Sequence, residues 1–96
     1  MLVISGELAV APEQHEQLLA LIDAVEGPSQ LEDGCRAYQF WLHRSERGSV
    51  HVFEIWESED ALLAHVATDH FRAFSAGLKQ LDVRTREIQR YQAEAR

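Results

Sequence analysis

The segment that spans residues 52–74 constrains the fold of this chain more than any other. It begins with β-branched and aromatic side chains, which predict a strand that ends at Trp56. Ser58 is a suitable N-cap and acidic residues follow it, so a helix is expected over residues 59–66. A second helix is expected to begin near His70. A strand and two helices in so short a span should enclose one small space.

The remaining residues predict an alternation of strands and helices. A helix is expected over residues 12–26, because Pro12 suits a first turn and Gly27-Pro28 should end it. Alternating or aromatic-rich runs predict strands over residues 2–10, 35–44, 49–57 and 82–91. This order is typical of one α+β domain over residues 1–96, with a ferredoxin-like βαββαβ fold. An antiparallel sheet would carry the helices on one face.

The third predicted strand is apolar on both faces. Val50, Val52 and Trp56 alternate with Phe53 and Ile55, and the preceding strand shows the same property. Helices on one side can cover only one of these faces, and a soluble monomer avoids a large exposed apolar patch. We therefore expect a two-fold homodimer, a dimeric α/β barrel in which two sheets pack face to face.

The charge balance excludes several classes of partner. The 96 residues include 9 basic and 16 acidic side chains, a net charge of −7, which argues against nucleic acid or an anionic membrane. No apolar run approaches the ~18–20 residues that cross a bilayer. The first residues lack a basic region and predict a strand, not a signal peptide. Cys35 is the only cysteine, which fits a cytoplasmic location and, after the Asp33-Gly34 turn, a structural role.

Several motifs carry a family resemblance. They are Glu32-Asp33-Gly34-Cys35 with Tyr38, Phe53-Glu54-Ile55-Trp56, Ser58-Glu59-Asp60-Ala61-Leu62, and His65 through His70-Phe71. With these motifs the chain resembles the antibiotic biosynthesis monooxygenase (ABM) family of the dimeric α/β-barrel superfamily. The resemblance implies a homodimer with a cavity between sheet and helices in each subunit. It also implies oxidation of quinol or anthrone-type phenols without flavin, haem or metal, although the family includes other activities.

The chain departs from two branches of that family. The haem-degrading branch has a haem-ligating His where this chain has Ser75, and an Asn where it has Gly6-Glu7. Haem degradation is therefore not expected. Some anthrone oxygenases have an Asn four residues before the strand-three Trp, where this chain has Val52.

His65 and Trp56 are the candidate catalytic residues. A histidine with a pKa near ~6.5 can take a phenol proton near neutral pH, so His65 is a candidate general base. It would face inward and would need a hydrogen-bond partner, for which Glu54 and Tyr38 are candidates. Trp56 could stack on a planar substrate and relay an electron to oxygen. The alternatives are a structural histidine and a core aromatic.

Five further residues are candidates for substrate binding. Glu54 shares a strand face with Trp56 and could orient His65 or bind a substrate hydroxyl; the alternative is an ion pair with Arg84 or Arg86. Tyr38 would help to orient the substrate. The other three candidates would line the cavity or its mouth, with surface or core positions as the alternative: His70, Phe71 and Phe74.

No metal site is expected. His65 and His70 lie five residues apart, which separates them by ~140° on an ideal helix, and a break in the helix is expected between them, so they are not expected to share a metal. The chain also has no HExxH, paired-cysteine or carboxylate-rich motif.

Two classes of function remain open. The first is a cofactor-independent monooxygenase that oxidises a small electron-rich aromatic with O2, using His65, Trp56 and an apolar cavity. The second is a non-catalytic, small-molecule-binding or stress-related dimeric module of the same fold. Isomerisation and aldehyde processing also need only a base and a pocket. All of these predict a small aromatic or hydrophobic ligand and no resident cofactor.

Overall fold

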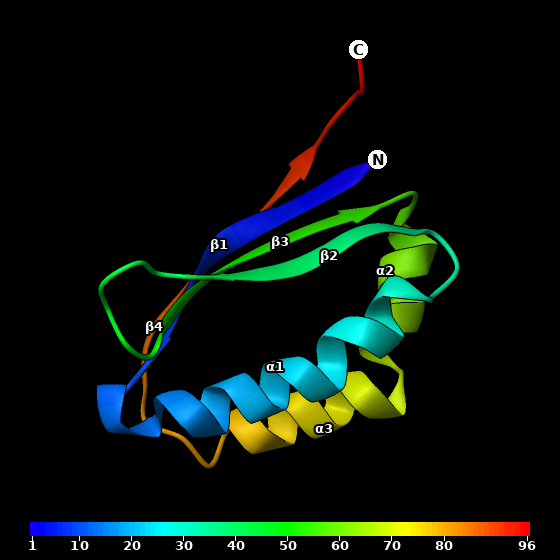
Figure 1. The fold of residues 1–96 in the computed structure, drawn as a ribbon. Helices are drawn as coiled ribbons and strands as arrows, with labels where there is room; N and C mark the ends of the chain where they lie inside the picture. Colours follow the sequence, from blue (N-terminus) through cyan, green and yellow to red (C-terminus); the bar gives the residue numbers. More distant parts are fainter.

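A four-stranded antiparallel sheet lies over a layer of helices in the computed structural model, which describes residues 1–96 (Figure 1). In chain order the elements are β1 (Leu2–Val10), a 3₁₀ turn (Pro12–Gln14), α1 (His15–Gln30), β2 (Cys35–Leu42), β3 (Ser49–Trp56), α2 (Glu59–Val66), α3 (Asp69–Leu78) and β4 (Val83–Gln92). The predicted ferredoxin-like α+β fold is confirmed. None of these helices is long and apolar enough to cross a membrane.

The sheet has the strand order β2-β3-β1-β4, so β2 and β4 are its edge strands. Directly opposite residues share a face of the sheet, and the register therefore assigns both faces. Ile4 lies opposite Glu54 on β3 and opposite Arg90 on β4, which places these three side chains on the helix-covered face. The next residues along each strand face away from the helices.

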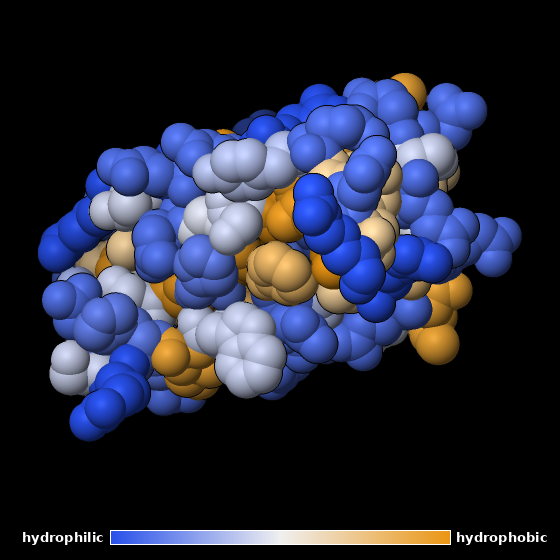
Figure 2. All heavy atoms as spheres, turned by 90° about the horizontal axis from the view of Figure 1, so that it is seen from above, coloured by the Kyte–Doolittle hydropathy of each residue, from blue (hydrophilic) through white to orange (hydrophobic).

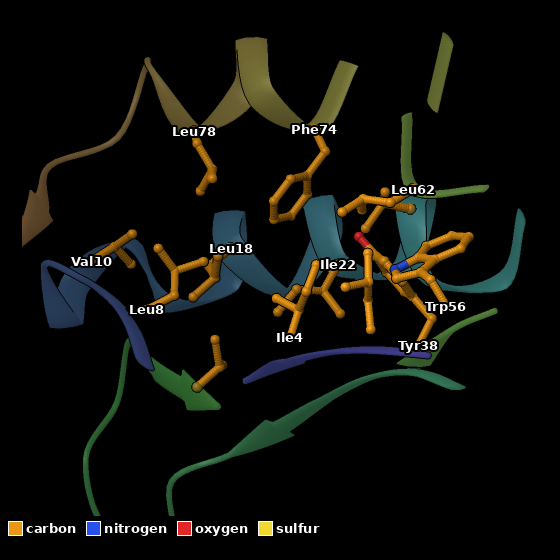
Figure 3. Packing of buried hydrophobic residues seen from close by; sticks show 13 residues of the cluster. Ile4, Leu8, Val10, Leu18, Ile22, Tyr38, Trp56, Leu62, Phe74 and Leu78 are labelled. Carbon is orange, nitrogen blue, oxygen red and sulfur yellow. The ribbon is translucent and has the colours of Figure 1, made fainter. Parts of the chain in front are cut away.

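The hydrophobic core lies between the sheet and the helices (Figure 3). Trp56 and Tyr38 come from the sheet, and Leu62 of α2 lies over them. Phe74 and Leu78 point from α3 toward the sheet. α1 and α3 run side by side in close contact, because a side chain at Gly77 would meet Leu21 at 2.3 Å. The site described below lies at the Trp56 end of this layer.

α1 continues through Pro28 to Gln30, so the predicted end of this helix at Gly27-Pro28 is wrong. Contacts beyond the local sequence hold its last turn. Ser29 is fully buried, and the Gln30 side chain donates a hydrogen bond to the Tyr38 carbonyl at 2.9 Å. These contacts outweigh the usual cost of proline in a helix. The extra turn carries the chain toward α2, where Glu32 lies.

The other face of the sheet has no covering element in the single chain. Figure 2 looks onto this face and shows apolar side chains near its middle, framed by polar ones. Trp41 is 60% exposed there, while Phe53 and Ile55 are partly exposed. The expected second apolar face is therefore present, and the homodimer remains a prediction.

Candidate active site

Two capped helix starts position the histidines. The Ser58 side chain accepts a hydrogen bond from the Ala61 backbone N–H and begins α2. The Thr68 side chain caps α3 by accepting from the Phe71 N–H, and its hydroxyl donates to the His65 carbonyl at 2.7 Å. This side chain thus joins the end of α2 to the start of α3, and the chain turns sharply between His65 and the second helix.

The loop between α1 and β2 brings Glu32 to the same place. Gly34 adopts a φ of 81°, which favours glycine, and an added Cβ would lie 2.6 Å from the Ala61 side chain. The Gly34 carbonyl also accepts a hydrogen bond from the Glu57 N–H at 2.8 Å. This loop therefore lies directly against α2 with little freedom to move.

Glu32 joins the two histidines. One of its carboxylate oxygens, Oε2, lies 2.8 Å from His65 Nδ1 and 2.7 Å from His70 Nε2. An ionised carboxylate only accepts hydrogen bonds, so each of these ring nitrogens carries a proton. The neutral His65 ring consequently has its lone pair on Nε2.

His65 is enclosed by aromatic rings and is only 1% exposed. Its ring centroid lies 4.7 Å from that of Trp56, 4.9 Å from Phe71 and 5.0 Å from Tyr38. Its Nε2 is buried and has no hydrogen-bond partner. Burial lowers the pKa of His65, against the opposing effect of the Glu32 hydrogen bond. Burial therefore favours the neutral ring, and Glu32 orients it with Nε2 as the unpartnered acceptor.

Glu54 lies beneath the histidine on the inner face of the sheet. Its carboxylate accepts a hydrogen bond from the Trp56 indole N–H at 2.9 Å. Burial is the main cause that raises the pKa of Glu54. The hydrogen bond from Trp56 lowers this pKa by a smaller amount, and nearby Glu32 raises it slightly further. Burial, with a contribution from Glu54, also raises the pKa of the Tyr38 hydroxyl. Both groups are therefore held toward their protonated forms.

A groove opens between these groups and the edge strand β4. It has a volume of about 360 Å³, and its lining residues come from the sheet and from α2 and α3: Ile4, Glu54, Glu59, Leu62, Leu63, His65, Val66, Phe71, Arg86, Ile88 and Arg90. A smaller cavity of about 60 Å³ lies next to it and shares Glu54, Phe71, Arg86 and Ile88. Arg86 forms no ion pair, although it lines both spaces. The arrangement offers a mostly apolar space with one histidine and two arginines, of which Arg90 pairs with Glu59 and Arg86 does not form an ion pair.

The structure brings together most of the residues that the sequence singles out. His65, Glu54 and Phe71 line the groove, and Tyr38 and Phe74 line the adjacent small cavity. Trp56 contacts His65 but is fully buried beneath it. His70 lies on the far side of His65, with 24% of its side chain exposed and bonded to Glu32. The assignment of catalytic and binding roles remains a prediction.

Two details of that prediction, and one alternative to it, are wrong. The partner of His65 is Glu32, not Glu54 or Tyr38. His65 and His70 converge on one oxygen atom, because the break between α2 and α3 turns the second ring back toward the first. Glu54 is bonded to Trp56 and forms no ion pair with Arg84 or Arg86.

Sequence reasoning missed Glu32 and Arg86 as site residues. Glu32 follows directly after the C-terminal end of α1, where the helix dipole disfavours a carboxylate. An acidic side chain at that position needs a compensating hydrogen-bond donor. The unfavourable position of Glu32 at the end of a helix could therefore have identified it as a site residue. Arg86 faces the helices from an edge strand whose inner face also carries Ile88 and Arg90.

Cys35 has no catalytic features. Burial, together with Glu32 and Glu54, raises the pKa of its thiol to about 11. A thiol with so high a pKa is a poor nucleophile at neutral pH.

Comparisons with known proteins place this chain in a family. The family model described as "Antibiotic biosynthesis monooxygenase" matches residues 1–77. A Mycobacterium tuberculosis protein named "Putative monooxygenase Rv0793" is 33% identical over 70 residues, which are 73% of this chain and 68% of that protein. A Synechocystis protein named "Uncharacterized protein sll1783" is 32% identical over 90 residues, which are 94% of this chain. The match covers only 61% of that relative's length.

Solved structures agree with this placement. A structure from Deinococcus radiodurans, described as a putative antibiotic biosynthesis monooxygenase, superposes with a TM-score of 0.89 at 26% identity. The superposition covers 100% of this chain and 95% of that one. The chain therefore belongs to the antibiotic biosynthesis monooxygenase family.

Proposed function

We propose that this protein is a cofactor-independent monooxygenase that oxidises a small electron-rich aromatic, a quinol or polyketide-type phenol, with O2. One observation carries the proposal. His65 lines an apolar groove, is held by Glu32 through Nδ1, and keeps a buried Nε2 without a partner. A buried acceptor with no donor is costly, so a ligand hydroxyl that supplies the donor would be bound favourably.

The proposed reaction begins with proton transfer from the substrate hydroxyl to His65 Nε2. The Glu32 carboxylate stabilises the imidazolium that forms, because it accepts the Nδ1 hydrogen bond. The electron-rich substrate anion then reduces O2 directly. One oxygen atom enters the substrate and the other leaves as water, with the substrate supplying all the electrons. The protein supplies the base, the orientation and a space poor in water.

The groove fits the anion that this reaction needs. Arg86 forms no ion pair and lines the groove together with His65, so its guanidinium can stabilise a phenolate oxygen. Phe71, Leu62 and Ile88 supply apolar walls for the ring system. The buried Trp56 supports His65 from below and would influence the substrate through that contact.

Oxygen consumption tests the proposal. Chelator-treated protein is mixed with a panel of quinols and anthrone-type phenols, and uptake is compared with that of His65→Ala protein. Uptake that depends on His65, with an oxygenated product by mass spectrometry, would support the proposal. Uptake that is the same in both proteins on every substrate would contradict it.

A non-catalytic binding module is the second candidate. The enclosure of His65 by three aromatic rings favours it, since a substrate must reach a nitrogen that is now covered. Saturable binding of an aromatic ligand without oxygen uptake or chemical change would select this alternative. An isomerised or aldehyde-derived product without oxygen uptake would instead indicate a different reaction at the same base.

The proposed enzyme is a homodimer joined through the exposed sheet face. Ile55 lies on that face near the C-terminal end of β3, opposite Val3 and Ala37. Sedimentation at micromolar concentration should give about twice the chain mass, and Ile55→Asp should shift the protein to monomer because burying an unpaired charge costs several kcal/mol. A wild-type monomer would contradict the dimer.

A further inference from the structure

Three ligand-capable side chains converge on one point beside the proposed base. His65 comes from α2, His70 from α3 and Glu32 from the loop between α1 and β2. His65 Nδ1, His70 Nε2 and Glu32 Oε2 all lie within 4.8 Å of one another. Both ring nitrogens direct their hydrogen bonds at the same carboxylate oxygen, so their in-plane directions meet there.

We propose that Glu32, His65 and His70 form a binding site for a divalent transition metal such as zinc, and that the bound metal silences His65 as a base. Two imidazoles and one carboxylate are a donor set that zinc commonly uses. The nitrogens lie 2.8 and 2.7 Å from the shared oxygen. Zinc–nitrogen bonds measure ~2.0–2.1 Å. If the metal takes the present position of the shared oxygen and the carboxylate moves back, each ring must therefore advance by about 0.7 Å.

The site is accessible from solvent on one side only. The side chains of His70 and Glu32 are 24% and 13% exposed, while that of His65 is 1% exposed. A metal would enter past His70, and water could fill the fourth position of a tetrahedral site. The structure holds a useful contrast on the outer sheet face, where His51 pairs with Glu7 at 2.8 Å without a second histidine.

Metal binding would change which nitrogen of His65 carries the proton. In the metal-free site Nδ1 donates to Glu32, and the lone pair lies on the unpartnered Nε2. A metal takes the lone pair of Nδ1, so a neutral ring must carry its proton on Nε2. Nε2 is then a donor and cannot accept a proton from a substrate. This consequence rests on the proposed function, whereas the metal site itself does not.

Calorimetric titration with zinc tests the site, using untagged, chelator-treated protein. We expect one zinc per chain in wild type. Changing outer-shell partners alone costs about 10–100-fold in metal affinity, so His70→Ala and Glu32→Gln should each weaken binding at least about tenfold. The matched control His51→Ala should leave binding unchanged. Absent binding in wild type, or affinity within about twofold of wild type in His70→Ala, would overturn the site.

Nitrogen-15 NMR of the histidine rings tests the consequence without any turnover. His65 should change from the Nδ1–H to the Nε2–H tautomer when zinc is added, and its assignment follows from the signal missing in His65→Ala. The ring of His15 should keep its tautomer. Stoichiometric zinc binding with His65 unchanged at Nδ1–H would overturn the assignment of this residue as a ligand.

Activity separates this inference from the proposed function. With an oxidisable substrate, zinc should inhibit wild type and His51→Ala alike, and inhibition of the residual activity of His70→Ala should need at least about tenfold more zinc. Equal inhibition of wild type and His70→Ala would overturn the silencing. If metal-free protein oxidises nothing, the proposed function fails while the titration and NMR results still decide the metal site.

Discussion

Two buried histidines lie at opposite ends of β3, and they use the same ring in opposite ways. His15 lies near the start of β3, and its Nδ1 accepts a hydrogen bond from the Gly48 backbone N–H at 2.8 Å. His65 lies near the end of β3, and its Nδ1 bonds the Glu32 carboxylate at the same distance. Both side chains are almost completely buried. Burial alone therefore does not distinguish a structural histidine from a candidate base.

The partner at Nδ1 makes the difference. A backbone N–H occupies the lone pair of His15, so its proton must lie on Nε2. A carboxylate holds the proton of His65 on Nδ1 and leaves the lone pair on Nε2. The first ring has used its acceptor to hold the hairpin between β2 and β3. The second keeps its buried acceptor without a partner, in a residue that lines a groove.

Removing the two rings should give the largest contrast. We expect His65→Ala to lower turnover of the best phenolic substrate by ~10²–10⁴-fold, the usual contribution of a positioned proton acceptor. His15→Ala should leave turnover near wild type when both are measured at a temperature where each protein is folded. Imidazole added to the buffer should restore part of the activity of His65→Ala only. Equal losses in the two variants would remove the distinction between the rings.

The stability of the His15→Ala variant tests whether His15 has a structural role. His15→Ala leaves the Gly48 N–H buried without its acceptor, which should lower the free energy of unfolding by ~1–3 kcal/mol. Urea unfolding followed by circular dichroism gives this value. An unchanged unfolding midpoint would mean that the hairpin does not depend on His15.

The smallest expected effect is on the pH dependence of stability, and it comes from Glu54. The pKa of Glu54 is raised above its ordinary value in the folded protein, chiefly by burial. The protonated form thus favours folding, so this contribution is complete below the unfolded pKa and is lost as pH rises through the folded pKa. Glu54→Gln keeps an acceptor for the Trp56 indole and removes the charge. Its stability relative to wild type should rise between pH 4 and neutral pH.

Urea unfolding at several pH values measures this difference. The pair of Glu7 and His51 offers a control, since Glu7→Gln removes a half-exposed carboxylate whose ion pair is screened by solvent and contributes little to stability. A difference between wild type and Glu54→Gln that does not change with pH would contradict the raised pKa.

Local signals predicted the helices that carry the site, and long-range contacts decided its chemistry. The bounds 59–66 were predictable because Ser58 caps α2 by the expected hydrogen bond. The proximity of Trp56 and His65 followed from a strand that leads directly into a helix. The end of α1 was not predictable, since contacts with β2 carry the helix past Pro28.

Glu32 shows why the rest of the site was harder to predict. It lies 33 residues before His65 in the chain, and only the packing of its loop against α2 brings them together. The break between His65 and His70 was predictable from Thr68, but the direction in which it turns the second ring was not. Periodicity describes a single element, whereas the shared carboxylate depends on how three segments meet.

The placement of the two tryptophans makes each face of the sheet visible to fluorescence. Trp56 is fully buried with its indole 4.7 Å from the His65 ring, and Trp41 is 60% exposed on the uncovered face. The buried indole should emit at shorter wavelength and respond to events around the imidazole. The exposed indole should emit at longer wavelength and shift only when another surface covers it. One emission spectrum can thus report separately on a ligand entering the groove and on a second chain joining the sheet.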